Sequence, residues 1–331
     1  MRDFKSIKKI DAHTHLETKN TALADLAKDN NFMLLSINTE VPGYPTLEKQ
    51  LEAATFLHKQ FPENVNFLTS FTLTGWDSVG WVDFTIAKLK SDFDKGALGV
   101  KVWKNIGMTY KDAKGNFVMI DNPKFDPVFT FIAQQDKTVL GHLGEPRNCW
   151  LPLEKMTVKS DQEYFKNHRE YHMFLHPEYP SYENQIDARD KMLERNPELR
   201  FVGAHLGSLE WSIDELAKRL DKSPKMAVDM AERICHLQLQ SMKDREKVRR
   251  FIIKYQNRLM YATDAWLDPE KDEATLKSNL HNTWLADWKY FVTKDKMTVK
   301  QFDGEFEGLQ LPKVVVDKIY YLNAARFYKM N

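Results

Sequence analysis

Eight short apolar runs, many of them rich in β-branched residues, recur along the chain and alternate with amphipathic stretches. This alternation is typical of strand–helix units packed around a parallel sheet. In the intervening stretches, apolar residues fall at three- and four-residue spacing and charges fill the other face, which predicts helices. The predicted strands are Ile7–His13, Phe32–Asn38, Val65–Leu73, Ala97–Trp103, Thr138–His142, Leu199–His205, Lys225–Asp229 and Arg258–Asp264, and the clearest predicted helices are Thr46–Phe61, Val82–Phe93 and Leu209–Leu220.

Eight such units in 331 residues predict a (β/α)8 TIM barrel, a fold that typically takes about 250 residues before insertions. A doubly wound open sheet is the alternative. The hydrophobic content of 42% is enough to bury a sizeable core, which excludes a disordered or fibrous protein. We therefore predict an α/β protein with one domain over residues 1–331.

Two segments are longer than a barrel needs. Leu143–Tyr182 follows the fifth predicted strand, and Trp266–Pro312 follows the eighth. Long loops at the carboxyl ends of barrel strands usually form the walls of the active site, so both segments are expected to bind substrate. The last stretch, Pro312–Tyr328, begins with proline and predicts a helix on the outside of the barrel.

The charge balance excludes several classes of partner. Forty-eight Lys and Arg against 47 Asp and Glu leave a net charge of +1, which does not supply the basic surface of a nucleic-acid-binding protein. The sequence has no run of about 18 apolar residues, and its start lacks the apolar core of a signal peptide. The cysteines, Cys149 and Cys235, form no CxxC pair and suit a reducing compartment. We expect a soluble, cytoplasmic protein that binds a small-molecule substrate and neither nucleic acid nor membrane.

The first predicted strand contains the sequence IDAHTHL, with two histidines two residues apart. Because side chains alternate along a strand, His13 and His15 are expected on one face, with Ile10 and Ala12 on the other. Such a pair on its own is as typical of core or surface histidines as of a metal site.

Three further residues of metal-ligand type lie at the ends of predicted strands. His142 ends the fifth strand, His205 the sixth and Asp264 the eighth. In a barrel these carboxyl ends converge on one mouth, where residues distant in sequence become neighbours. Histidines scattered by chance over helices and loops would not show this placement. The sequence therefore predicts a metal site at the mouth.

Several imidazoles with one carboxylate suit Zn²⁺ best, with Mn²⁺, Fe²⁺, Co²⁺ and Ni²⁺ as alternatives. A divalent metal with an open position can lower the pKa of water from 15.7 to about 7 and polarise a substrate carbonyl. The predicted site therefore favours hydrolysis.

The HTH of the first strand, the GVKVWK of the fourth, the single histidines after the fifth and sixth and the TD of the eighth resemble the amidohydrolase superfamily of metal-dependent TIM barrels. The closer similarity is to the amidohydrolase-related branch, which includes aminocarboxymuconate semialdehyde decarboxylase, related aromatic-acid decarboxylases and lactone hydrolases. The resemblance covers nearly the whole chain, including the ending YYLNAARFYK, and it does not specify one reaction.

This resemblance implies that His13, His15, His142 and Asp264 bind one divalent metal ion. It also implies that His205 is the acid or base that orients or deprotonates water, so His205 and Asp264 would be the catalytic residues. By spacing alone, His205 is equally suited to be a metal ligand. Barrels of this superfamily commonly form homo-oligomers, which the resemblance extends to this chain.

Lys101 is expected to point into the barrel, because the alternating apolar residues of Leu98–Val102 form the face toward the helices. Two-metal members of the superfamily bridge their metals with a carboxylated lysine on this strand, whereas in the closer branch the matching lysine is electrostatic or substrate-binding. We favour one metal. An ion pair with an inward acid, Asp11 or Asp229, is the alternative reason for a buried lysine. Lys104 falls on the opposite face by alternation.

Charged residues near the predicted mouth are candidates for substrate binding. Glu145 and Arg147 follow the fifth strand, and Arg233 follows the seventh. Charges on a solvated loop would give the same pattern, so this alternative stays open.

Three histidines, His168, His172 and His176, recur every four residues. They lack a carboxylate in clear register, which favours a partly exposed helix over a second metal site. Only His176 is retained as a candidate substrate contact. Cys149 has no histidine in evident pairing and is predicted to be a structural thiol.

Three functions are consistent with these residues. The leading one is a metal-dependent hydrolase of a carboxylic ester, lactone or amide. The second is a metal-dependent, non-oxidative decarboxylase of an aromatic or unsaturated acid, in which Lys101, Arg147 or Arg233 would hold the carboxylate and His205 would protonate carbon. The third is a catalytically silent metal- or ligand-binding barrel, against which the presence of His205 beside the ligands argues.

Overall fold

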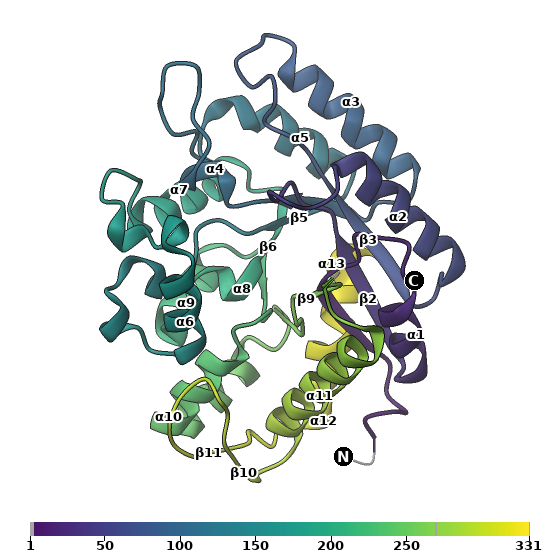
Figure 1. The fold of residues 1–331 in the computed structure, drawn as a ribbon, viewed down its shortest axis with the longest axis vertical. Helices are drawn as coiled ribbons and strands as arrows, with labels where there is room; N and C mark the ends of the chain where they lie inside the picture. Colours follow the sequence, from purple (N-terminus) through teal and green to yellow (C-terminus); the bar gives the residue numbers. More distant parts are fainter. Residues whose placement is uncertain (1–2, 269, 331) are drawn as a thin grey trace.

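The computed structural model describes residues 3–268 and 270–330. Nine parallel strands form one curled sheet, in which β1 to β8 pair in chain order and β9 pairs with β1. Helices surround this sheet, and the sequence colours run around it in order (Figure 1). The strands are β1 (Lys9–His15), β2 (Phe32–Ile37), β3 (Val65–Ser70), β4 (Gly99–Val102), β5 (Thr138–Gly141), β6 (Arg200–Gly203), β7 (Met226–Asp229), β8 (Leu259–Met260) and β9 (Ala265–Trp266).

Two short strands close the sheet into a barrel: β8 lies within the predicted eighth strand, and β9 lies just beyond its predicted end. The first pairs with β7 and the second with β1. Between them, the Ala12 N–H donates to the Tyr261 carbonyl (3.0 Å) and the Asp264 N–H donates to the His13 carbonyl (2.9 Å). The predicted (β/α)8 barrel is confirmed, with its eighth strand interrupted at residues 261–264.

The three helices predicted most clearly are observed as α2, α3 and α9. Side-chain caps start several helices, since the first backbone N–H groups of a helix have no partner within it. Ser181 and Asn184 form a reciprocal capping box at the start of α7, and Asp272 accepts the Thr275 N–H (2.9 Å) at the start of α11. The helices are α1 (Ala22–Asp29), α2 (Leu47–Gln60), α3 (Trp81–Asp94), α4 (Asn105–Met108), α5 (Asp126–Gln134), α6 (Lys159–Asn167), α7 (Tyr182–Arg195), α8 (Ala204–Gly207), α9 (Ile213–Lys222), α10 (Ile234–Lys254), α11 (Glu273–Val292), α12 (Lys313–Asp317) and α13 (Asn323–Tyr328).

The strands carry an inner and an outer apolar face. Inside the barrel, Ile10, Leu35, Leu140 and Val202 belong to one compact cluster. Residues of the opposite parity pack with the surrounding helices in the large outer cluster. This division follows from the two-residue period of a strand. The inner cluster leaves the carboxyl-terminal end of the barrel to polar side chains.

A β-bulge interrupts the alternation in β1. Asp11 aligns with Leu34 of β2, whereas Thr14 aligns with Ser36, so three steps along β1 oppose two steps along β2. One residue of β1 is therefore extra. Bulges of this kind re-aim the side chains that follow them and are frequent beside active sites.

The bulge places two consecutive residues inside the barrel. Ala12 packs in the inner cluster, and His13 contacts side chains of β4 and β7 across the barrel. The prediction that Ile10 and Ala12 lie opposite His13 and His15 is therefore wrong, because simple alternation does not hold across the bulge.

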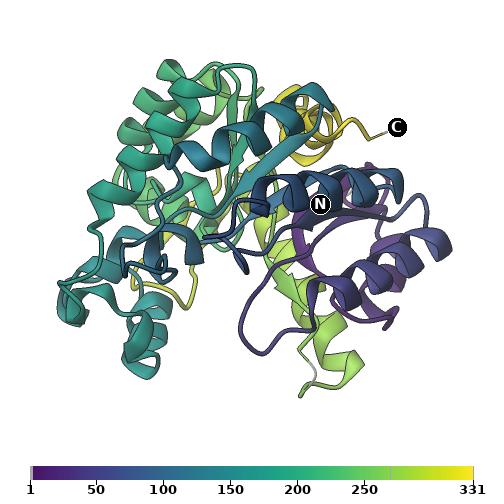
Figure 2. The same cartoon turned by 90° about the horizontal axis from the view of Figure 1, so that it is seen from above.

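The predicted closing helix consists of α12, a π-helical turn over Lys318–Leu322 and α13. In α13, Phe327 and Tyr328 join the inner cluster, and the Phe327 carbonyl accepts from Thr138 Oγ1 (2.5 Å) at the first residue of β5. This helix thus covers the amino-terminal end of the barrel, where we had predicted packing on its outside. Figure 2 shows α13 in yellow at one end and the teal segment 143–182 toward the other.

The two long segments differ in their roles. The first carries α6 and contributes to the pocket described below. The second carries α11, in which Trp284 and Trp288 are buried in the outer cluster. Three other residues of this segment, Trp266, Thr283 and Gln301, line the same pocket, so its predicted role in substrate binding stays a prediction. Among the residues that the structure describes, no helix is both long and apolar enough to cross a membrane.

Candidate metal centre

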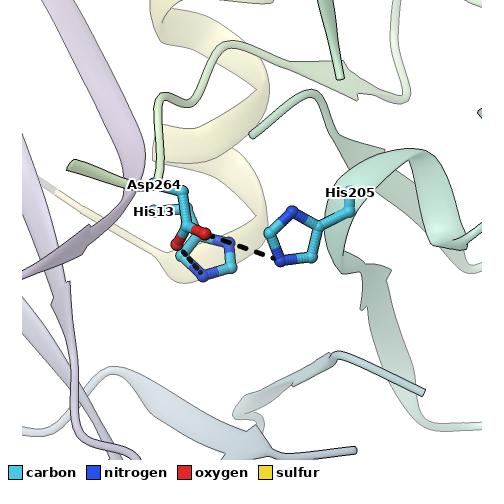
Figure 3. Close-up of side chains that lie close together, drawn as sticks. All are labelled: His13, His205 and Asp264. Carbon is cyan, nitrogen blue, oxygen red and sulfur yellow. Dashed lines mark ion pairs between the residues drawn. The ribbon is translucent and has the colours of Figure 1, made fainter. Parts of the chain in front are cut away.

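His13, His205 and Asp264 lie together at the carboxyl ends of β1, β6 and β8 (Figure 3). One ligand-type atom from each of them lies within 4.8 Å of the others. Asp264 Oδ1 is 3.0 Å from His13 Nε2 and 3.2 Å from His15 Nε2, and Asp264 Oδ2 is 3.9 Å from His205 Nε2. The structure therefore brings four of the five predicted residues into one cluster.

Hydrogen bonds at Nδ1 fix three of the imidazole rings. An Nδ1–H donated to an acceptor leaves Nε2 with a free lone pair, which is the tautomer that a metal or a proton requires. In each ring Nδ1 lies within hydrogen-bond distance of an acceptor: His13 with Asp229 Oδ2 (2.8 Å), His15 with the Ile37 carbonyl (3.2 Å) and His205 with the Ala231 carbonyl (3.0 Å).

The donor atoms fit a divalent cation. Two ligands at 2.0–2.1 Å from a tetrahedral Zn²⁺ lie about 3.3 Å apart, close to the 3.0 and 3.2 Å found here between Asp264 Oδ1 and two imidazole nitrogens. Among the described residues, this buried carboxylate oxygen has no hydrogen-bond partner. Buried charged oxygens are normally paired, so a cation at this point would satisfy it.

His142 follows β5 and reaches the same mouth. The centre of its ring is 4.3 Å from that of His205, and its Nε2 is 3.6 Å from Glu145 Oε2. These contacts are with His205 and Glu145, so the role of His142 as a metal ligand stays a prediction.

Two lysines lie beside the histidines. Lys101 is buried, with Nζ 3.2 Å from His13 Nε2, so its predicted inward orientation is found. The alternative ion pair with Asp11 is wrong, because the bulge leaves that carboxylate outside the barrel. Lys104 forms an ion pair with Glu145. Burial lowers the pKa of each lysine to about 8.

Burial also lowers the pKa of three histidines. The pKa of His205 falls to about 3, that of His142 falls well below its usual value, and that of His15 is lowered. Burial and the nearby lysine charge oppose protonation of His13 too, but the two neighbouring carboxylates raise its pKa overall. Neutral imidazoles are the form that binds metals and accepts protons.

The backbone that carries His205 is a left-handed turn. The φ angles of residues 205, 206, 207 and 208 are 57°, 57°, 63° and 57°. This conformation costs roughly 1–2 kcal/mol per residue other than glycine, so its surroundings must hold it in place. Three buried side chains do so: Asp229 Oδ1 accepts the His205 N–H (2.7 Å), Tyr182 Oη donates to the Ser208 carbonyl (2.5 Å) and Arg189 Nη1 donates to the Gly207 carbonyl (2.5 Å).

The cluster lies in a cavity of about 690 Å³, a size suited to a small-molecule ligand. Tyr44 and Trp266 stack with ring centres 5.7 Å apart, and Tyr44 also contacts the ring of His15. Besides these two, the wall carries aromatic rings and charges of both signs: Trp103, Tyr164, Phe165, Tyr171, Lys101, Lys104, Glu145, Asp161, Glu232 and Arg233.

The predicted substrate-binding residues divide into two groups. Lys101, Glu145 and Arg233 line the cavity. Arg147 instead lies over the Trp211 ring, 4.2 Å from its centre, and His176 Nε2 is 3.0 Å from the Arg169 carbonyl. The structure does not bring these last two to the cavity wall.

The other predictions for this segment can be compared directly. The helix expected around His168 and His172 ends at Asn167 and continues as short 3₁₀ turns. Cys149 is buried and its thiol donates to the Tyr171 carbonyl (2.9 Å), while burial raises its pKa to about 12. Such a thiol is unreactive, in agreement with the predicted structural role.

Two functional residues were not recognised in the sequence. Asp229, considered only as a partner for Lys101, instead contacts His13 and the backbone of His205. It ends β7, so the strand-end position that pointed to the other residues was also present here. Lys104 was placed on the wrong face because β4 ends at Val102 and strand alternation no longer applies beyond it.

The amidohydrolase family model matches residues 10–330. The chain belongs to the amidohydrolase family. This confirms the resemblance drawn from the HTH, GVKVWK and TD sequences. No curated protein matches this amidohydrolase-family sequence.

Several solved structures share the fold of this amidohydrolase-family chain. The 2,6-dihydroxybenzoate decarboxylase from Rhizobium is 12% identical, with 98% of this chain and 99% of that chain covered and a TM-score of 0.56. The 5-carboxyvanillate decarboxylase from Sphingomonas paucimobilis is 13% identical over 95% and 84%, with a TM-score of 0.53. A probable 2-pyrone-4,6-dicarboxylic acid hydrolase from Acinetobacter baumannii is 10% identical over 98% and 100%, with a TM-score of 0.52.

Proposed function

We propose that the protein is a metal-dependent hydrolase that cleaves a carboxylic ester, lactone or amide bond of a small molecule. The observation that supports this is the position of Asp264 Oδ1, which lies 3.0 Å from His13 Nε2 and 3.2 Å from His15 Nε2, as expected for pairs of ligands around one ion. His142 is the proposed fourth ligand. Zn²⁺ suits the set best, with Mn²⁺, Fe²⁺, Co²⁺ and Ni²⁺ as alternatives.

A bound divalent cation would polarise a substrate carbonyl and lower the pKa of water. The proton transfers belong to His205. Its Nδ1–H is held by the Ala231 carbonyl, and its Nε2 is unprotonated because burial lowers the pKa to about 3. We assign Nε2 as the base that accepts a proton from the attacking water and then returns it to the departing alcohol or amine. Asp264, 3.9 Å away, stabilises the imidazolium formed between these steps.

Three cations lie among the carboxylates of the cavity wall and support an anionic group on the substrate. Lys101 and Lys104 lie beside the histidines, and Arg233 has its guanidinium 3.8 Å from each of two carboxylates, Asp161 and Glu232. We propose that these cations hold a carboxylate of the substrate or the acid released by hydrolysis.

The same cations support a second candidate, a non-oxidative decarboxylase of an aromatic or unsaturated carboxylic acid. In that reaction the carbon–carbon bond to the carboxylate breaks, CO2 leaves and the carbon retains the electron pair. His205 Nε2 is unprotonated at rest, so it would first take up a proton from water in the cavity and then donate that proton to the carbon. Two decarboxylases among the structural neighbours add to this alternative.

Metal analysis and one substrate panel together test the proposal. We expect about one divalent ion per chain, and both Asp264→Asn and His142→Ala should lose it while the barrel stays folded. The panel contains esters, lactones, amides and aromatic carboxylic acids, with released acid and released CO2 measured separately. Acid release that stops on chelation supports hydrolysis, whereas CO2 release supports the second candidate. A metal-loaded chain inactive on the whole panel would be a ligand-binding barrel.

A further inference from the structure

The geometry points to two positioning residues outside the cavity: we infer that Asp11 and Trp284 hold Asp264 in place through Thr263. The inference rests on the proposed role of Asp264 as a metal ligand. Neither Asp11 nor Trp284 lines the cavity, so both act through Thr263, which does.

Asp264 sits on an unusual piece of backbone. Its φ angle is 64°, in the left-handed region, within the interruption between β8 and β9. Regular strand pairing is missing at this point, so the ladder alone does not fix the direction of its side chain. One backbone hydrogen bond, from the Asp264 N–H to the His13 carbonyl (2.9 Å), ties it to β1.

Thr263 supplies the missing restraint. Its N–H donates to Asp11 Oδ1 (2.9 Å) and its hydroxyl donates to Asp11 Oδ2 (2.6 Å). The same hydroxyl accepts the N–H of Ala265 (3.1 Å). The residues on both sides of Asp264 are thus anchored to one carboxylate.

That carboxylate is itself fixed by the outer helix α11. Trp284 Nε1 donates to Asp11 Oδ2 (3.0 Å), and the indole stacks on Phe32 of β2 with ring centres 3.9 Å apart and planes 15° apart. Asp11 and Trp284 are both fully buried. Asp11 therefore accepts three hydrogen bonds where no water can replace them, which makes its position well defined.

The β-bulge explains why Asp11 is free for this role. It lies in β1 just before the bulge, so its side chain faces the helices, whereas His13 after the bulge faces the cavity. One strand therefore carries ligands on its inner side and, on its outer side, the anchor for a ligand that lies between β8 and β9. Partners of this kind affect metal affinity about 10- to 100-fold in other proteins.

Two substitutions at residue 263 test the inference. Thr263→Val keeps the shape and removes the hydroxyl, whereas Thr263→Ser keeps the hydroxyl and removes a methyl group. We expect the dissociation constant for Zn²⁺, measured by competition with a chromogenic chelator, to rise about 10- to 100-fold in the valine variant and to stay within about 3-fold of the parent in the serine variant. Trp284→Phe, which retains the stacked ring, should raise it by a smaller factor. Thermal unfolding of the metal-free proteins then shows whether each variant is folded before its Zn²⁺ affinity is compared with that of the parent.

Each other result has a definite meaning. Unchanged Zn²⁺ affinity in both Thr263→Val and Trp284→Phe, in a parent that binds Zn²⁺, would overturn the inference alone. Equal losses in the valine and serine variants would also overturn it, because they would assign the effect to volume. A parent that binds no divalent ion at all would overturn the proposed function instead. If the valine variant does not fold, Trp284→Phe decides the question.

Discussion

Asp229 Oδ2 lies 2.8 Å from His13 Nδ1 across the inside of the barrel. Its other oxygen accepts the backbone N–H of His205 at 2.7 Å. A single carboxylate at the end of β7 therefore orients a proposed ligand on β1 and the start of the turn that carries the proposed base. Loss of this carboxylate should affect both functions together.

We predict that Asp229→Asn weakens Zn²⁺ binding by about 10- to 100-fold, because an amide has only one accepting oxygen and its NH2 group cannot accept from the second donor. The same chelator competition measures this affinity. Turnover at saturating Zn²⁺ should also fall, since the His205 turn loses its anchor. The exposed variant Asp83→Asn is the control and should match the parent. Full Zn²⁺ affinity in Asp229→Asn would show that His13 is oriented without it.

For His205 the prediction separates metal binding from proton transfer. His205→Asn should keep the metal content of the parent while turnover falls roughly 100- to 10,000-fold, the usual contribution of a positioned acid or base. Metal analysis and steady-state kinetics on the same preparation give both numbers. Should the variant lose its metal, His205 belongs among the ligands, which its distance of 3.9 Å from Asp264 Oδ2 also allows.

Tyr182 offers a test of the left-handed turn. Tyr182→Phe removes the hydroxyl that donates to the Ser208 carbonyl and accepts from Trp211 Nε1 (2.8 Å). We expect kcat to fall about 2- to 13-fold, the factor that corresponds to the net contribution of about 0.5–1.5 kcal/mol of one hydrogen bond, with Zn²⁺ affinity unchanged. Half-buried Tyr321 of the closing helix lies outside the cavity and provides the control, Tyr321→Phe. An unchanged kcat in Tyr182→Phe would mean that Arg189 and Asp229 hold the turn alone.

The stability of the barrel should depend on the ionisation of Asp287 in α11. Burial raises the pKa of this carboxyl from 3.8 to about 7, and Tyr261 Oη donates to its Oδ2 (2.9 Å). Because the folded pKa is the higher one, the protonated form stabilises the fold below about pH 4, and this contribution is lost as the pH rises through 7. The asparagine of Asp287→Asn can still accept from Tyr261 but carries no charge.

We therefore expect the melting temperature of the parent, relative to Asp287→Asn, to fall between about pH 5 and pH 8. Differential scanning calorimetry at the two pH values measures this change. Glu63→Gln, which alters an exposed carboxylate, should show no such trend. A constant difference between parent and Asp287→Asn would indicate that the carboxyl has the same pKa in the folded and unfolded states.

The order of elements and most of the site residues could be predicted from the sequence, because they depend on local periodicity and on strand ends. Strand-end positions of His13, His142 and Asp264 are properties of short segments, and the barrel then brings such ends together. The burial of α11 was missed because it depends on residues of other segments. Trp284 and Trp288 are recognised as core residues only from their contacts with Asp11 and Lys9 of β1 and with Phe32 of β2.

The direction in which an individual side chain points was harder to predict wherever the backbone departs from regular geometry. Ile10 was misplaced by the bulge in β1, and Lys104 by the early end of β4. The left-handed conformations of His205 and Asp264 leave no signature in residue type, since neither position is glycine. These features depend on partners from other strands, so a single segment does not encode them.

The extra residue in β1 matters to anyone who wishes to transplant this centre onto another barrel. Grafted into a strand without it, His13 and His15 would keep the parity of Asp11 and turn toward the helix layer. In such a strand the Asp11 carboxylate and both imidazoles would all point toward the helix layer. A scaffold that receives the two histidines must therefore also receive the irregular backbone between residues 11 and 14, or the ligands will be present in the wrong compartment.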